Sequence, residues 1–166
     1  MSERTPGPNQ VSELHPAVKA GGIAGALAAA AALIMMFEGS TNRAVIPVKG
    51  DVPTICYGHT QGVHMGDTAS KAQCKAYLKT DLRTALRVQR CIYVTVPEDS
   101  LAAFISFAYN VGPSTFCGSS VARDLNAGHL DAACRDMGKF VYVKGRVVQG
   151  LVNRRKVEVA YCQRGL

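Results

Sequence analysis

Two carboxylates and one hydroxyl lie close together in the first third of the chain. Glu38 follows a long apolar run, and Asp51 and Thr54 come after it beside a glycine-containing turn, so that the three span 17 residues. Hydrolysis of a glycosidic bond needs one carboxylic acid to protonate the leaving oxygen and a second group to activate a nucleophile on the other side of the sugar. The spacing therefore predicts an acid–base hydrolase site with Glu38 as the acid and Asp51 and Thr54 holding a water.

Each of the three residues also has a purely structural interpretation. Glu38 suits the polar end of an apolar helix, Asp51 is a common turn residue after a glycine, and Thr54 is typical of a strand. Taken singly, the structural roles are the more common ones. The combination of all three over so short a stretch favours the catalytic interpretation.

The apolar run before Glu38 covers residues 20–37 and contains no charged residue. As a helix rising about 1.5 Å per residue, it would nearly cross a hydrocarbon core about 30 Å thick. The run is rich in alanine and glycine, however, so its insertion into a bilayer is favoured by only about a few kcal/mol. It is predicted to be a marginal transmembrane segment.

Three interpretations of this run stay open: a permanent membrane anchor, a cleaved signal peptide, and a signal anchor that enters the membrane and later joins the soluble domain. A permanent anchor would contain more leucine, valine and isoleucine, and cleavage among the alanines would cut the helix that carries Glu38. We expect the third. Lys19 on the N-terminal flank predicts that this end stays in the cytoplasm and that the rest of the chain lies outside.

A β-hairpin is predicted around Asp51. Two β-branched runs, residues 44–48 and 52–58, flank the glycine-containing turn. Prolines in both runs indicate an edge-type hairpin that faces solvent.

The rest of the chain is predicted to be helical. A helix capped by Thr68 or Ser70 follows the hairpin and continues to Val88. The next helix is apolar on nearly every side and ends at Gly112, which indicates the buried centre of a helical lobe. It and the later helices are expected at residues 97–109, 121–127, 130–139 and 151–162. This order predicts an α+β fold with a small β-hairpin lobe and a larger helical lobe.

Length and charge limit the partners. A chain of 166 residues has room for one catalytic domain. Lys and Arg outnumber Asp and Glu by 19 to 12, which favours an anionic partner, and the charges are spread along the chain. An acidic envelope polymer and a membrane surface both fit this balance. The chain has no zinc-finger spacing, basic-region heptads or aromatic RNA-binding motif, so we do not expect nucleic acid as a partner.

Six cysteines, none in a Cys-x-x-Cys pair, indicate disulfides formed in an oxidising compartment. The histidines show no metal-ligand spacing, so we expect neither a metal nor a cofactor. Six cysteines allow about 15 pairings, and the sequence does not decide among them. We predict the sequential one, which joins Cys56 to Cys74, Cys91 to Cys117 and Cys134 to Cys162.

Four motifs together give the chain a resemblance to a known family. Glu38-Gly39 is followed by Thr-Ile-x-Tyr-Gly-His-Thr at 54–60, by Ser-Phe-x-Tyr-Asn-x-Gly at 106–112, and by Asn-Arg-Arg at 153–155. Over residues 37–162 this pattern resembles the phage lysozymes of the T4-lysozyme type, glycoside hydrolase family 24. The N-terminal run is similar to that of phage endolysins with a signal-anchor-release segment, such as those of the lambdoid phage 21 group.

The resemblance implies a lysozyme-like fold and a muramidase that cuts, with inversion, the β-1,4 bond between N-acetylmuramic acid and N-acetylglucosamine in peptidoglycan. The family's catalytic triad maps to Glu38, Asp51 and Thr54. In the family pattern the Asp stands six residues before the Thr, where this chain has Val48, whereas Asp51 stands three before it. Asp51 would reach the cleft from the other arm of the turn.

The resemblance also assigns supporting residues. Arg154 matches the basic partner of the catalytic Glu, and Asn110 belongs to the second motif. His59 matches a histidine that pairs with an acid in the next helix, here Asp81. We expect the pair of His59 and Asp81 to be structural.

The combined prediction is a monomeric phage endolysin with a tail and signal-anchor-release segment at 1–37 and a catalytic domain at 38–166. It lies in the host inner membrane with its N-terminus in the cytoplasm and moves to the periplasm on release, when the apolar segment packs on the domain and delivers Glu38 to the cleft. A lytic transglycosylase is one alternative, since it would use the same Glu without water and leave an anhydro ring. A non-enzymatic, membrane-anchored wall-binding protein is the other.

Overall fold

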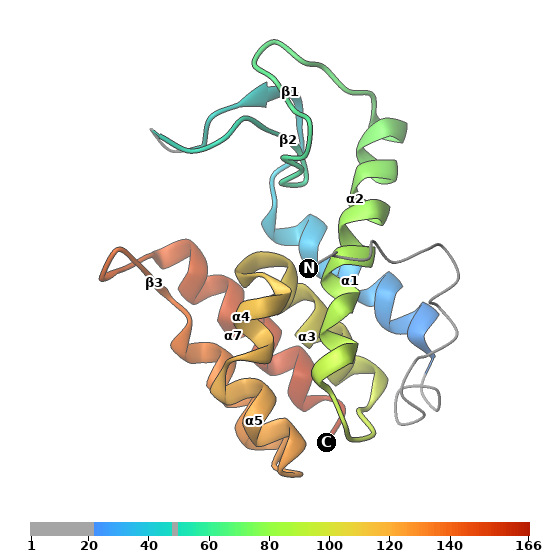
Figure 1. The fold of residues 1–166 in the computed structure, drawn as a ribbon, viewed down its shortest axis with the longest axis vertical. Coiled ribbons are helices and arrows are strands. Elements are labelled where there is room, and N and C mark those ends of the chain that lie inside the picture. The colour runs from blue at the N-terminus through green and yellow to red at the C-terminus, as the bar shows by residue number, and fades with distance from the viewer. Residues whose placement is uncertain (1–21, 48–49) are drawn as a thin grey trace, which may run out of the picture.

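The computed structural model describes residues 22–47 and 50–166, and it has two lobes joined by one long helix (Figure 1). The antiparallel hairpin of β1 (Thr41–Val45) and β2 (Thr54–Cys56) forms the small lobe. Helix α2 (Lys71–Ala85) extends from that lobe along the helical lobe, which contains all other helices of the described residues. This arrangement confirms the predicted α+β class with a hairpin lobe and a helical lobe.

Some of the predictions fall outside the described ranges. The tail and Lys19 precede residue 22, and Val48, at the family's acid position, lies between the two ranges. These predictions stay predictions.

Helix α1 (Ile23–Phe37) packs an apolar face, which includes two alanines, against α3 (Glu98–Val111). Three residues of this face have no exposed surface: Ala26, Ala30 and Ile34. The helix ends at Glu38, where the backbone becomes extended while its N–H still donates to the Ile34 carbonyl at 2.8 Å. Among the residues that the structure describes, no helix combines the length and the apolarity needed to cross a membrane.

The hairpin is shorter than predicted and shifted toward the N-terminus. Strand β1 starts at Thr41 rather than at residue 44, and Thr41 pairs with Cys56. Strand β2 starts only after Pro53, because proline cannot donate a hydrogen bond to the ladder. It ends at Cys56, because Cys56 and Gly58 have φ angles of 58° and 89° that interrupt the extended backbone.

Helix α2 begins at a capping box. The Ser70 hydroxyl accepts a hydrogen bond from the Gln73 N–H at 3.2 Å, and the Gln73 side chain accepts one from the Ser70 N–H at 2.8 Å. Of the two predicted caps, Ser70 is therefore the one used. After Ala85 the chain tightens into the 3₁₀ helix η3 (Leu86–Cys91), so the predicted helix continues through Val88 with a change of helix type.

Helix α3 is the centre of the helical lobe, as predicted. Residues 100–108 are all buried. Phe104 and Phe107 pack edge-on against Phe116, with ring centroids 5.7 and 6.3 Å apart. Gly112, with a φ of 91°, ends the helix in a conformation that favours glycine.

The C-terminal half of the chain closes the lobe with several elements, of which helix α4 and the β3–β4 hairpin were not predicted. Helix α4 starts at Pro113 because proline is compatible with the first turn of a helix, and the β3–β4 hairpin turns through Lys144 and Gly145, both with positive φ. These elements are α4 (Pro113–Cys117), α5 (Ser120–Asn126), α6 (Leu130–Asp136), η4 (Met137–Lys139), β3 (Tyr142–Val143), β4 (Arg146–Val147) and α7 (Gln149–Gln163).

Three disulfides confirm the predicted sequential pairing. Each ties neighbouring elements together across a loop of 18 to 28 residues. By restricting the unfolded chain, a cross-link over such a loop stabilises the fold by about 3 kcal/mol. The bridges join β2 to α2 (Cys56–Cys74), η3 to α4 (Cys91–Cys117) and α6 to α7 (Cys134–Cys162).

The packing of α1 predicts a contrast between two positions on the same helix. Ile34→Ala should lower the free energy of unfolding by about 2–5 kcal/mol, because it empties a fully buried site. Met36→Ala is the control, since Met36 is 66% exposed and its truncation should change stability by less than about 0.5 kcal/mol. Urea unfolding followed by circular dichroism measures both. Equal losses would contradict the burial of α1 in the folded protein.

Candidate active site

Helix α1 ends at the junction of the two lobes (Figure 1), and Glu38 is its C-terminal cap. Its side chain is 27% exposed, and its Oε1 accepts a hydrogen bond from Arg154 Nη1 at 2.5 Å. The Arg154 guanidinium lies over the Phe37 ring, 5.2 Å from the ring centroid. The structure thus brings together the acid and the arginine that the sequence singled out.

Arg154 is a buried cation with three acceptors. Its Nε donates to Glu158 Oε1 at 3.0 Å, its Nη2 donates to the Ser106 carbonyl at 3.1 Å, and its Nη1 donates to Glu38. Arg154 is 3% exposed and Glu158 is fully buried. Charges buried to this degree are stable only when they are paired and hydrogen-bonded. The network therefore fixes the orientation of Arg154, which in turn fixes the Glu38 carboxylate.

A second buried arginine extends this network to Asn110. The Arg155 guanidinium donates to Asn110 Oδ1 and to Glu158 Oε2, and its Nε donates to the Phe140 carbonyl at 3.1 Å. Burial lowers the pKa of Arg155, and the charge of Glu158 opposes that effect. Glu158 thus accepts from both arginines, and Asn110 is the exposed end of the network.

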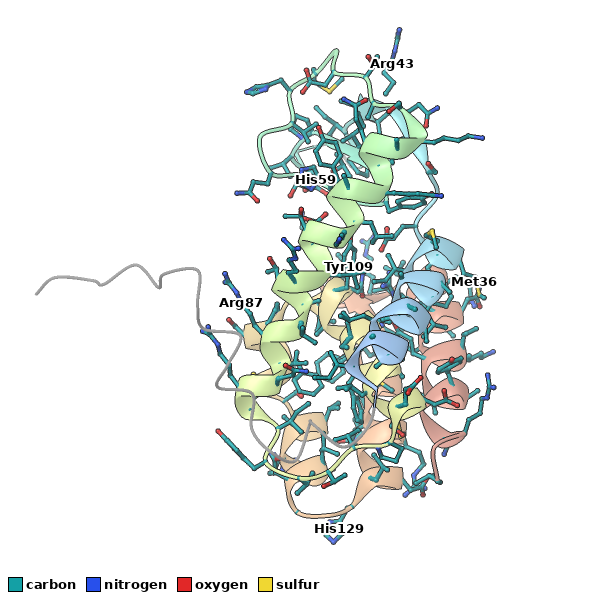
Figure 2. All side chains as sticks on the ribbon, turned by 90° about the vertical axis from the view of Figure 1, so that its right-hand side faces the viewer. Met36, Arg43, His59, Arg87, Tyr109 and His129 are labelled. Carbon is teal, nitrogen blue, oxygen red and sulfur yellow. A yellow bond between two sulfur atoms is a disulfide. The ribbon has the colours of Figure 1, made fainter. Side chains whose placement is uncertain are left out.

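The end of the hairpin motif approaches Glu38 from the other lobe. Gly58 has a φ of 89°, which favours glycine, and a Cβ at this position would lie 3.5 Å from Glu38 Oε2. The Tyr109 hydroxyl on α3 donates to the Tyr57 carbonyl at 2.8 Å. Figure 2 shows Tyr109 near the junction, with His59 above it in the small lobe. The turn after β2 is therefore held close to Glu38.

His59 and Asp81 join the small lobe to α2. His59 Nδ1 lies 2.9 Å from Asp81 Oδ2, and the imidazole stacks on the Tyr77 ring with centroids 4.2 Å apart and planes 4° apart. His59 is only 6% exposed. These contacts hold His59 on two sides and tie the end of the hairpin to α2.

The negative charges of two carboxylates act on the Tyr109 hydroxyl. Its hydroxyl is 3.5 Å from Asp81 Oδ2, in addition to its bond to the Tyr57 carbonyl. Burial, followed by the negative charges of Asp81 and Glu38, raises the pKa of Tyr109 well above its usual range. The phenol therefore stays protonated and keeps its donor bond across the lobe junction.

The side chains of Asp51 and Thr54 form hydrogen bonds with the backbone of Val52, which lies between them in the chain. The exposed Asp51 carboxylate accepts a hydrogen bond from the Val52 N–H at 2.9 Å, and the Thr54 hydroxyl donates to the Val52 carbonyl at 3.1 Å. Within residues 22–47 and 50–166, no hydrogen bond or ion pair joins either of them to Glu38. The structure thus gathers Glu38 with the arginine network and leaves the other two predicted catalytic residues in the hairpin lobe.

Two residues of this region were not singled out from the sequence. Glu158 stands four residues after Arg154, a spacing that places both on one face of a helix. Tyr109 directly precedes Asn110 in the second motif. The four-residue spacing and the motif position can both be read from the sequence. The burial of Glu158 and the partial burial of Tyr109, which make their contacts significant, cannot.

Known proteins share this fold and sequence. The phage lysozyme family profile matches residues 35–158. The SAR-endolysins of Enterobacteria phages PA-2 and P21 are each 36% identical over 156 residues, which cover 90% of this chain and 94% of the relative. The muramidase domain of SpmX from Asticaccaulis excentricus has a similar structure, with a TM-score of 0.74 and 27% identity over 81% of this chain and 94% of that one.

The chain belongs to the phage lysozyme family. Membership confirms the predicted resemblance, the lysozyme-like fold, the enzyme class and the function as a phage endolysin. The roles of individual site residues stay predictions.

The environment of Tyr109 predicts how stability depends on pH. Its folded pKa is raised above the ordinary value of 10.0, so the unfolded chain releases this proton first as the pH rises. The stabilisation is therefore complete below about pH 10 and is lost above it. The unfolding free energy of the parent should fall more steeply above about pH 10 than that of Tyr109→Phe. Denaturant unfolding at a series of pH values measures the slopes.

Tyr142→Phe is the matched control for this measurement. Tyr142 is 62% exposed, so its replacement should keep the parent's slope. Equal slopes for the parent and Tyr109→Phe would contradict the assigned environment of Tyr109.

Proposed function

We propose that this lysozyme cleaves the β-1,4 bond between N-acetylmuramic acid and N-acetylglucosamine in peptidoglycan and so lyses the host of a phage. The observation that carries the proposal is the ion pair of Glu38 with the buried Arg154 at the lobe junction. Membership of the family and the likeness to a muramidase domain support this substrate. The excess of basic residues fits an anionic wall polymer.

Glu38 is the proposed general acid. Its protonated carboxyl gives a proton to the glycosidic oxygen while the bond between that oxygen and C1 of N-acetylmuramic acid breaks. Arg154 then pairs with the carboxylate that remains. Because Glu158 and the Ser106 carbonyl hold Arg154, the cation stays in place while the substrate moves.

Asp51 and Thr54 are proposed to hold the water that attacks C1 from the opposite face. The Asp51 carboxylate takes a proton from the water, the Thr54 hydroxyl positions it, and the new C1–O bond forms with inversion. The two carboxyl groups of an inverting hydrolase stand about 6.5–9.5 Å apart, which leaves room for that water. The exposure of Asp51 supports this role, since its carboxylate is open to solvent.

We also propose that the enzyme starts in the host inner membrane, with its N-terminus in the cytoplasm, and acts in the periplasm after release. The similarity to SAR-endolysins supports this course. In the membrane state residues 20–37 are the anchor and the cleft is not assembled. In the released state α1 packs against α3 and delivers Glu38 to the cleft, so release shifts the population between two states.

The same residues therefore belong to an anchor in one state and to the helical lobe in the other. The predicted boundary between the anchor segment at 1–37 and the catalytic domain at 38–166 therefore applies to the membrane state. The released enzyme is proposed to act as a monomer, because one chain carries all of the proposed catalytic residues.

The proposed acid predicts the effect of three substitutions. Glu38→Gln should lower the release of fragments from purified peptidoglycan by about 10²–10⁴-fold, because an amide cannot give up the proton. Asp51→Asn and Thr54→Ala should also lower the rate while leaving the ion pair of Glu38 with Arg154 in place. Mass spectrometry of the released fragments measures both the amounts and the products.

Glu98→Gln is the matched control, since Glu98 is an exposed glutamate at the start of α3 and should keep the parent's rate. Fragments with intact reducing ends from the parent support hydrolysis. Anhydro products would assign the enzyme to the lytic transglycosylases, and a fully active Glu38→Gln variant would refute the role of Glu38.

The exposed face of α1 predicts a change in release. Replacing Ala28 and Ala32 with leucine should hold the chain in the membrane longer, because each leucine favours insertion by about 0.3–0.6 kcal/mol. Both alanines are exposed in the folded enzyme, so the packing against α3 stays intact. Serine at the same two positions should shorten retention. Membrane fractionation and the time of lysis measure both effects, and release of the leucine variant at the parent's time would contradict the proposal.

A further inference from the structure

An apolar groove lies between α1 and α2, two neighbouring helices that cross in Figure 1 and lie next to each other in Figure 2. Its volume is about 490 Å³, within the range of small-molecule sites. On the α1 side it is lined by Ala24, Leu27, Ala28, Ala31 and Met35. Their spacing places them in one stripe of the helix. This stripe is separate from the face that packs against α3.

The α2 side of the groove combines leucines with three cations. Lys75, Lys79 and Arg83 follow one another at four-residue steps, and all three are exposed. None of them makes an ion pair with another residue in the part of the chain that the structure describes. Lys71 and Arg87 continue the same spacing beyond the two ends of the groove. The groove thus has an apolar floor and one basic edge.

We propose that this groove binds an acyl chain of an anionic phospholipid, with the lipid phosphate against Lys75, Lys79 and Arg83. The stems of such side chains lie along apolar surface while their charged ends stay in water, an arrangement suited to a lipid interface. The described lining residues offer no aromatic ring, hydroxyl or amide side chain with which to recognise a sugar. A lipid therefore fits better than a wall glycan.

This site goes beyond the proposed function, because it includes none of the proposed catalytic residues and requires no hydrolysis. A released enzyme with a lipid in this groove stays at the surface of the bilayer. The site would thus keep the lysozyme in the layer of periplasm next to the membrane.

Calorimetric titration of the purified full chain with 1-myristoyl-lysophosphatidylglycerol, kept below its critical micelle concentration, tests the proposal. We expect one lipid per chain, bound about tenfold or more tightly than the zwitterionic choline lipid of the same chain length, because the basic edge attracts the anionic headgroup. Glycerol phosphate, which has no acyl chain, should not bind measurably. Absence of binding by the anionic lipid, or equal affinity for the two lipids, would overturn the proposal.

Two substitutions on α1 test whether the lipid binds in the groove. Ala28→Phe fills the groove and should weaken lipid binding by about tenfold or more, since a blocked apolar site loses most of its contacts. Ala32→Phe is the control on the same helix, because Ala32 is exposed and does not line the groove. Equal losses in the two variants would overturn the assignment of the site.

Charge variants test the basic edge. The double variant Lys75→Gln and Lys79→Gln should lose the preference for the anionic lipid, whereas Arg87→Gln, outside the groove, should keep it. Unfolding midpoints and fragment release from peptidoglycan should match the parent in every variant, so failure of this inference is distinguishable from failure of the proposed function. Binding of soluble anionic wall fragments in the groove instead of the lipid would refute it.

Discussion

Arg154 is a buried cation with only 3% of its surface exposed. Its guanidinium donates hydrogen bonds to acceptors from three parts of the chain. Glu38 follows α1, the Ser106 carbonyl belongs to α3, and Glu158 belongs to α7. Removing one partner of a buried ion pair such as Arg154–Glu158 costs about 3–5 kcal/mol, so this pair fixes the guanidinium to which α1 and α3 are bonded. The position of the candidate acid is therefore a property of the helical lobe.

The composition of α1 affects both its packing against α3 and its insertion into a bilayer, and the two favour different side chains. Its buried face needs small side chains, because Ala26 and Ala30 let the helix approach α3 closely. A stable anchor would need larger apolar side chains, which insert more favourably into a bilayer. Alanine allows the close approach to α3 but favours insertion into a bilayer only weakly. This composition supports the proposed release of α1 from the membrane.

The sequence predicted the elements whose signals are local and strong. Ser70 with its capping box and the apolar run of α3 located two main helices, and the motifs located Glu38 and Arg154. Helix α4 and the β3–β4 hairpin were missed, because a helix of 5 residues and strands of 2 residues each are too short to show a periodic apolar pattern. The role of Glu158 depends on burial between two arginines, which no local pattern reveals. Asp51 departs from the family spacing, so the motif alone did not define its geometry.

The two lobes differ in how much apolar surface holds them together. Among the described residues of the hairpin lobe, the buried apolar cluster consists of Ile55, Cys56, Ala69 and Cys74, and its two cysteines form a disulfide. Segments with few buried apolar contacts open locally at lower free energy than the main core. Such an opening would carry Asp51 and Thr54 away while the arginine network kept Glu38 in place. Reduction of one bond, Cys56–Cys74, would therefore loosen the hairpin that carries Asp51 and Thr54 and leave Glu38 and the arginine network ordered.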